Sequence, residues 1–151
     1  MFKDRKRRVF MAAFGGAIML AGVGTTGTAM AAKFRADLSG EHLASAGDTD
    51  GWGRAKIRVD DTFNELCVDL EVRSIGEVTS AQIHRGAEGV EGPAVVNLDR
   101  PDDDSDSEDC DNIGDELADE IQANPGEFYV LIETTDHPQG ALRGQLNPST
   151  G

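Results

Sequence analysis

Apolar and polar residues alternate strictly in two neighbouring segments near the middle of the chain. Residues 54–59 (RAKIRV) set three apolar side chains against three cations, and residues 66–72 (LCVDLEV) alternate in the same way with anions on the polar side. Strict alternation predicts strands that are buried on one face. Pairing Val59 with Leu66 in an antiparallel hairpin satisfies both faces at once, so we predict this register. The charged pairs expected in it are Lys56 with Asp69 and Arg54 with Glu71.

A second hairpin is predicted near the C-terminus. Alternate residues of 128–132 share an apolar face, as do alternate residues of 142–146, and residues 136–140 supply a turn of five residues. This turn places Glu133 opposite Arg143. The two charges then form a cross-strand ion pair or belong to a site.

Three further short strands are predicted at residues 34–38, 81–84 and 93–98, each bounded by glycine or polar turns. One helix, at about residues 112–124, interrupts the strands and ends at Pro125-Gly126. Its apolar residues at four-residue steps are Ile113, Leu117 and Ile121. About seven to eight short strands with one short helix predict an all-β fold, an antiparallel sandwich or barrel, because one helix cannot supply the crossovers of a parallel sheet.

Residues 102–111 (DDDSDSEDCD) are too polar to be buried, so we predict a surface loop. Carboxylate oxygens suit hard cations, which makes Asp102, Asp104 and Asp106 candidate calcium ligands. The segment lacks the glycine and the spaced bidentate glutamate of the helix-loop-helix calcium motif. A solvated acidic face is therefore the alternative interpretation.

The N-terminal residues 1–32 have the three-part layout of an export signal. A basic stretch at 3–8 precedes an uncharged run at 9–24, and small residues follow. The uncharged run is shorter than the ~20 residues of a spanning helix, so we expect cleavage rather than anchoring. Residues 7–11 (RRVFM) resemble the twin-arginine export motif, with the general secretory route as the alternative. We expect residues 33–151 to form one exported domain, secreted or at the cell surface.

Acidity dominates the expected mature chain. Without residues 1–32 the chain keeps 9 Lys+Arg and 27 Asp+Glu, a net charge of −18. Such a chain repels nucleic acid phosphates and anionic membrane surfaces, so neither is expected as a partner. One hypothesis is that the acidity is an adaptation to high salt, which screens the repulsion between the negative charges.

Cys67 and Cys110 are the only cysteines, and an oxidising compartment favours a disulfide between them over two free thiols.

Candidate chemistry is sparse, with only three histidines, His42, His84 and His137. A transition-metal site could combine His84 and Gln82 with either Glu133 or His137, although glutamine is a poor ligand for such metals. A hydrogen-bonded structural role for His84 is the alternative. No serine lies in a Gly-x-Ser-x-Gly turn, and neither cysteine has a histidine near it in the sequence. No catalytic constellation is therefore predicted.

Three glycines follow His84, at 86, 89 and 92. They do not form a phosphate loop, because no lysine followed by serine or threonine closes it. We expect them to turn the chain between two strands, since glycine reaches positive φ at no steric cost. We expect Ala81 and Ile83 to face the core, and Gln82 and His84 to face the other way.

Three segments resemble the CHRD (chordin) domain family, in its stand-alone secreted microbial form. Residues 81–98 (AQIHRGAEGVEGPAVVNL) resemble the family's Ala-His-Ile-His, Gly, Gly-Pro-Val-Val-Val core. Residues 124–146 (NPGEFYVLIETTDHPQGALRGQL) resemble its closing segment, and residues 34–42 (FRADLSGEH) are similar to its first strand. The matching positions are Gln82, His84, Gly86, Gly89, Gly92, Pro93, Tyr129, Glu133, Pro138, Gly140, Arg143, Gly144, Gln145 and Leu146. Gln82 and Glu133 stand where the family often has histidine.

The resemblance implies an extracellular β-rich module. Because no catalytic constellation is predicted, we expect a non-enzymatic extracellular or cell-surface module without a cofactor. It would bind an unidentified extracellular or envelope protein or polymer, or have a structural role. Two alternatives stay open from the residues. One is a metal-binding protein with a sandwich like that of superoxide dismutase, using His84 and its neighbours. The other is a surface protein stabilised by calcium at residues 102–111.

Overall fold

The computed structural model describes residues 31–102 and 104–150. The predicted export signal, residues 1–32, therefore lies almost wholly outside the described residues. The elements in chain order are β1 (Ala32–Ser39), η1 (Gly40–His42), β2 (Trp52–Asp60), β3 (Glu65–Arg73), β4 (Val78–Arg85), β5 (Ala94–Asn97), β6 (Asp106–Asn112), α1 (Asp115–Ala123), η2 (Pro125–Glu127), β7 (Phe128–Thr134), β8 (Leu142–Gln145) and β9 (Asn147–Pro148). The predicted all-β fold with one short helix is confirmed.

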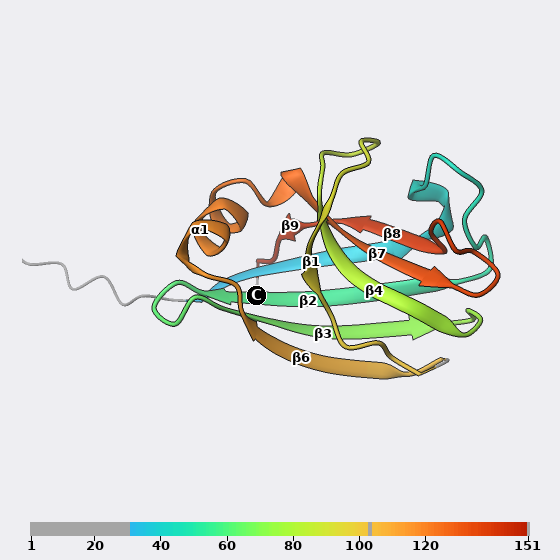
Figure 1. The fold of residues 1–151 in the computed structure, drawn as a ribbon, viewed down its shortest axis with the longest axis horizontal. Coiled ribbons are helices and arrows are strands. Elements are labelled where there is room, and N and C mark those ends of the chain that lie inside the picture. The colour runs from blue at the N-terminus through green and yellow to red at the C-terminus, as the bar shows by residue number, and fades with distance from the viewer. Residues whose placement is uncertain (1–30, 103, 151) are drawn as a thin grey trace, which may run out of the picture.

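The strands form one continuous sheet in the order β5-β4-β7-β8-β1-β2-β3-β6, with β9 paired to β1. Every pairing among the described strands is antiparallel. Figure 1 shows the sheet curling round on itself, with α1 across one end. Within the described residues, no helix is long and apolar enough to cross a membrane.

The core lies on the concave face of the curled sheet. Alternate residues of the strands are directed there, and α1 adds the buried Ala118 and Ile121. The largest fully buried side chains are Phe128, Ile57, Leu66, Leu70, Ile83, Ile121, Ile132, Leu142, Leu146, Val59, Val72 and Val130. The predicted inward positions Ala81 and Ile83 are confirmed, with exposures of 2% and 0%.

The register predicted for the first hairpin is confirmed. Val59 pairs with Leu66, and the pairing continues along the whole of β2 and β3. The predicted charged partners also lie opposite each other, Lys56 with Asp69 and Arg54 with Glu71. Burial on one face and charge on the other therefore select the same register.

The register predicted for the second hairpin is wrong by two residues. Arg143 lies opposite Leu131, while Glu133 lies opposite Ser80 on β4. The turn begins earlier than its polar residues suggest, because Thr134 and His137 exchange two hydrogen bonds: Thr134 N donates to His137 O, and His137 N donates to Thr134 Oγ1. The Glu133–Arg143 ion pair predicted from the sequence does not form.

The acidic segment predicted as a surface loop is largely a strand. Residues 106–112 form β6, which pairs with β3 along its length and is an edge of the sheet. Asp109 and Asp111 lie opposite Val68 and Leu66, on the core side of the sheet but at its open margin. Charges are tolerated there because an edge strand has no neighbour to cover them, and they discourage pairing with other chains.

The predicted disulfide is present and joins β3 to β6. Cys67 and Cys110 are direct cross-strand partners, with their Cα atoms 4.1 Å apart. The bond therefore fastens the edge strand to its neighbour, rather than pinning a loop to the domain.

Candidate functional site

Three side chains of the family-like motifs stack on the convex face of β4, β7 and β8. His84 lies opposite Tyr129, and the two rings stack with centroids 5.2 Å apart. The guanidinium carbon of Arg143 lies 3.6 Å from the centroid of the Tyr129 ring. Strand pairing alone brings together these residues, which are up to 59 positions apart in the chain.

Arg143 is buried, with only 3% of its surface exposed. Its Nη2 donates hydrogen bonds to the carbonyl oxygens of Ala87 at 2.9 Å and Val90 at 2.8 Å. No carboxylate of the described residues forms an ion pair with it. Two backbone carbonyls and the face of the Tyr129 ring thus stabilise a desolvated positive charge.

Tyr129 and one further side chain, Gln145, hold the segment that contains Ala87 and Val90, residues 86–93, which we call the 86–93 loop. The Tyr129 hydroxyl accepts a hydrogen bond from Gly92 N at 3.1 Å. Gln145 Nε2 donates to the carbonyls of Gly86 and Gly126, each at 2.7 Å. Figure 1 shows the loop projecting from the sheet between β4 and β5. The Arg-Gly-Gln segment therefore acts as an anchor for a loop nearly 60 residues earlier in the chain.

The glycines of this loop are required for two different reasons. Gly89 has a φ of +76°, as the turn prediction anticipated. Gly92 has no positive φ, but a Cβ there would lie 1.6 Å from the carbonyl oxygen of Arg85. A Cβ at Gly86 would lie 2.7 Å from the Val90 carbonyl oxygen. Close approach of the backbone, and not turn geometry, therefore explains why residues 86 and 92 are glycine.

The other motif positions support the anchor from within the fold. Leu146 is fully buried in the core. A Cβ at Gly144 would lie 2.4 Å from the Asp37 carbonyl oxygen, so glycine allows β8 to approach β1. Gly140, with a φ of +133°, lies with Pro138 in the turn between β7 and β8. The Pro93 carbonyl accepts the backbone N–H of Arg85.

His84 connects β4 to the end of the loop. Its Nδ1 lies 2.8 Å from the Gly92 carbonyl oxygen, which can only accept, so Nδ1 carries a proton. Its Nε2 lies 3.2 Å from Gln82 Oε1, and Gln82 Nε2 donates to Asn97 Oδ1 at 2.7 Å. The hydrogen bond from Nδ1 ties the ring to the end of the loop, which fits the structural role considered from the sequence.

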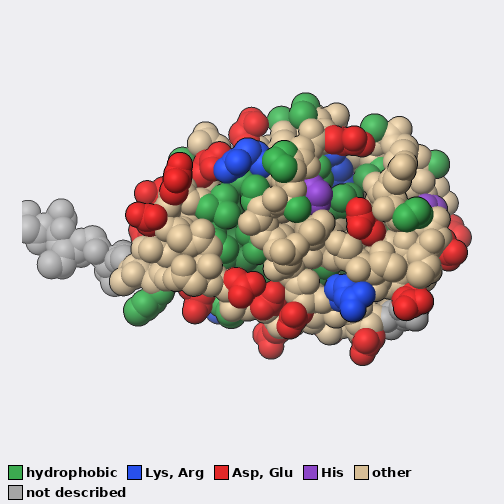
Figure 2. All heavy atoms as spheres, in the orientation of Figure 1, with side chains coloured by type: hydrophobic (Ala, Val, Ile, Leu, Met, Phe, Trp, Pro, Cys, Tyr) green, Lys and Arg blue, Asp and Glu red, His purple; other side chains and the backbone are tan. Residues whose placement is uncertain are grey.

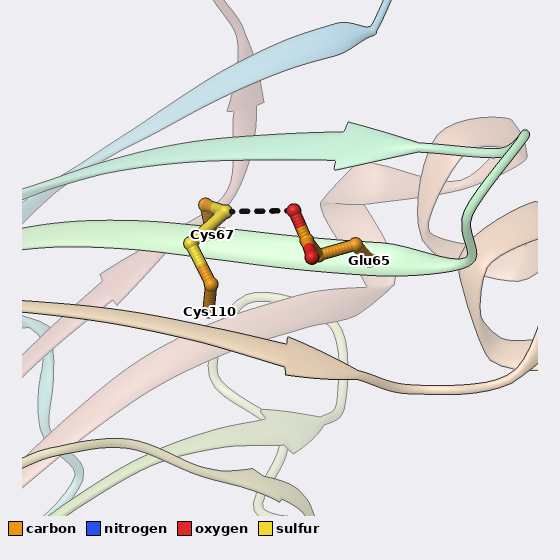
Figure 3. Close-up of a disulfide and its surroundings, with 3 residues drawn as sticks. All are labelled: Glu65, Cys67 and Cys110. Atoms are coloured by element: carbon orange, nitrogen blue, oxygen red, sulfur yellow. Dashed lines mark hydrogen bonds between the residues drawn. A yellow bond between two sulfur atoms is a disulfide. The ribbon is translucent and has the colours of Figure 1, made fainter.

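The candidate transition-metal ligands His84, Glu133 and His137 are not brought together in the described part of the chain. The one group of three potential ligands there is Glu65, Cys67 and Cys110 (Figure 3). Its two sulfurs are bonded to each other, so neither is a thiolate ligand. The 3.5 Å contact of Glu65 Oε1 with Cys67 Sγ is not a hydrogen bond, because a disulfide sulfur has no proton.

The candidate calcium ligands Asp104 and Asp106 contact the end of β3 instead. Asp106 Oδ1 accepts a hydrogen bond from Arg73 Nη1 at 3.0 Å, and Asp104 accepts one from Ser74 N. The hydrogen bond to Asp106 raises the pKa of Arg73 above its ordinary value. Asp102 contributes its backbone carbonyl to a turn. The carboxylates of Asp104 and Asp106 thus fasten the start of β6 to the end of β3.

A cleft of about 380 Å³ lies beside the stacked side chains. His84, Tyr129 and Arg143 line one side of it, and the 86–93 loop contributes Glu91. Further lining residues, which sequence reasoning missed, are Leu43, Ser45, Leu131 and Gln139. They belong to separate loops and to β7, and no local pattern indicates that they meet. The cleft and the exposed tip of the loop form one candidate binding surface.

One comparison with known proteins identifies a relationship. The model of a protein family described as the CHRD domain matches residues 34–146. This range begins within β1 and ends just after β8. No curated protein and no solved structure matches the chain significantly.

Proposed function

The chain belongs to the CHRD domain family, and we propose that it is an exported, non-enzymatic module that binds a partner outside the cytoplasm. Three observations support this proposal. Domains of this family are typically extracellular. The Cys67–Cys110 disulfide is compatible with an oxidising compartment. The first 32 residues have the layout of an export signal.

The observation that carries the binding role is the use of a buried charge to order a loop. Burying an arginine without a carboxylate is costly unless its N–H groups are hydrogen-bonded, and Arg143 directs two of them at loop carbonyls. The loop so ordered exposes 53% of Val90, between the exposed Glu88 and Glu91. A preorganised loop binds a partner with little entropic cost. We propose that the loop tip and the adjoining cleft contact the partner.

Export is tested by expressing the full chain in its natural host and following it by mass spectrometry. The expected result is a protein in the medium or at the cell surface that begins near residue 33. Replacing Arg7 and Arg8 with lysine stops this export if the twin-arginine route is used, and leaves it unchanged for the general secretory route. Full-length protein retained in the cytoplasm would contradict the proposal.

The binding role is tested with fluorescently labelled protein added to washed cells of the producing organism. Val90→Ser removes the exposed apolar side chain at the loop tip and should lower cell binding. Phe63→Ser is the matched control, because Phe63 is 68% exposed in the turn between β2 and β3, outside the loop. Equal binding by the two variants and the unaltered protein would refute the role of the loop.

A further inference from the structure

The curled sheet is open along one side, between its two edge strands. β5 and β6 end the strand order and do not pair with each other. Their margins are tied at Asp99, whose N–H donates to Asp109 Oδ2 at 3.0 Å and whose carbonyl accepts from Ser107 Oγ at 2.9 Å. At the other end of this opening, α1 lies beyond β6 along the chain, and a hollow of about 470 Å³ lies between α1, β4 and β5. We call this hollow the α1–β5 groove.

The groove has an apolar floor and an acidic rim. Its apolar lining residues, Val95, Ile113 and Leu117, are half-buried and pack on the core. Figure 2 shows hydrophobic side chains exposed on this face, with acidic side chains around them. The carboxylates that line the groove are Asp115, Glu116 and Glu120.

The rim keeps a negative charge after its internal ion pair is counted. Arg85 is the one cation among the described lining residues. It is neutralised by Glu120 through two contacts, from Nε at 3.1 Å and from Nη2 at 2.5 Å. Asp115 and Glu116 form no ion pair within the described residues. They leave the rim anionic within a chain that is anionic overall, so a cationic partner is attracted both locally and at long range.

Beside the groove, two positions beyond Val95, the margin of β5 also offers backbone groups that have no partner among the described residues. Leu98 N donates to the Ala81 carbonyl of β4 at 2.9 Å, and Asn97 lies opposite Gln82. Hydrogen-bonded and non-hydrogen-bonded pairs alternate along an antiparallel ladder. The N–H and carbonyl of Asn97 therefore point away from β4, toward the opening. A free strand margin of this kind accepts an added strand.

We propose that the α1–β5 groove binds an extended segment of a partner protein in which cationic and aliphatic side chains alternate. The segment pairs with the free margin of β5. Its aliphatic side chains lie on Val95, Ile113 and Leu117, and its cations face Asp115 and Glu116. This site is separate from the 86–93 loop and does not depend on its role.

The probe is a synthetic peptide of about nine residues that alternates lysine and valine. This length lies within the usual range for a strand. Its counterpart has glutamate in place of lysine. Each peptide is titrated into the isotopically labelled protein at an ionic strength of about 0.01 M, where the Debye length is about 30 Å. We expect the lysine peptide to bind, and the exchange of the Asn97 amide proton with solvent to slow by about tenfold or more. The glutamate peptide should not bind.

Two variants separate the groove from general attraction to an acidic protein. Glu116→Lys should weaken binding by about tenfold, whereas Glu88→Lys, the same charge change on the 86–93 loop, should weaken it by less than about twofold. Val95→Thr makes the floor more polar without changing charge and should weaken binding by about threefold, with only a small fall in the urea midpoint of unfolding because Val95 is half-buried.

Each contrary outcome overturns the proposal. Absence of binding by the lysine peptide would do so, as would binding that leaves the Asn97 amide unprotected. Equal weakening by Glu116→Lys and Glu88→Lys would show that the charge of the whole protein attracts the peptide. Self-association of the protein that protects Asn97 without any peptide would identify a second copy of this chain as the occupant.

Discussion

Replacing Arg143 with alanine tests how strongly the 86–93 loop is anchored. The change removes two hydrogen bonds from a charged donor, each of which contributes about 1.5–3 kcal/mol. It also removes the contact with the Tyr129 ring, worth about 2 kcal/mol at a desolvated site. These contributions are not independent, since all three act on one side chain. Because the contributions overlap, we expect the free energy of unfolding to fall by about 4 kcal/mol, which is less than their sum.

Equilibrium urea unfolding measures this change, with the disulfide kept oxidised. At a denaturant slope of about 2 kcal/mol/M, a loss of about 4 kcal/mol lowers the urea midpoint by about 2 M. Arg143→Lys keeps the charge but loses the planar guanidinium that lies over the Tyr129 ring and reaches the two carbonyls, so it should lose about half as much. Arg58→Ala is the control, because Arg58 is exposed on β2 and forms no ion pair within the described residues. It should change the free energy by less than about 0.5 kcal/mol.

The same experiment can refute the reasoning. If Arg143→Ala changes the free energy of unfolding by less than about 1 kcal/mol, the two carbonyl contacts do not hold the loop. A second measurement tests the location of the effect. Backbone amides of the loop, those of Gly86 and Gly92 above all, should exchange with solvent faster in the variant, while amides of β2 and β3 follow the global free energy.

Three further predictions concern the disulfide, a glycine of the 86–93 loop and the net charge. Replacing Cys67 and Cys110 together with serine should lower the free energy of unfolding by about 4 kcal/mol, the chain-entropy value for their separation of 43, and an unchanged urea midpoint would contradict this. Gly92→Ala should cost more than about 2 kcal/mol, because its Cβ meets the Arg85 carbonyl, whereas Gly126→Ala, with no atom within 4 Å, should stay within about 0.5 kcal/mol; equal thermal melts for the two would count against the close approach. Added sodium chloride should raise the melting temperature of residues 33–151, since screening relieves the repulsion of their net charge of −18, and a melt independent of salt would argue against that repulsion.

Local patterns predicted the elements whose partners are adjacent in the chain. The β2–β3 hairpin was predicted to the residue because burial and charge select one register. The β7–β8 register was predicted wrongly because hydrogen bonds between Thr134 and His137 set the turn, and turn residues alone do not reveal them. The acidic segment was predicted as a loop because its composition suits solvent, yet composition cannot show that β3 has a vacant edge for it.

Of the candidate site, the sequence indicated the participants but not their roles. His84, Tyr129, Arg143 and Gln145 were singled out through a resemblance to the CHRD domain. Only the structure shows that they hold one loop, because β7 is inserted between β4 and β8 in the sheet. The α1–β5 groove had no sequence signal at all, since it is the space left where the two edges do not meet.

The sequence by itself determined the strands other than β6 and β9, the faces they bury, the short helix and the pairing of the only two cysteines. These follow from alternation and composition over a few residues, which act on the chain before it is folded. The tertiary structure alone decided the strand order, the open seam between β5 and β6, and the burial of Arg143 beneath a distant loop. Those features depend on contacts between residues far apart in the chain. Such contacts stabilise the protein only once the whole sheet has curled around its core.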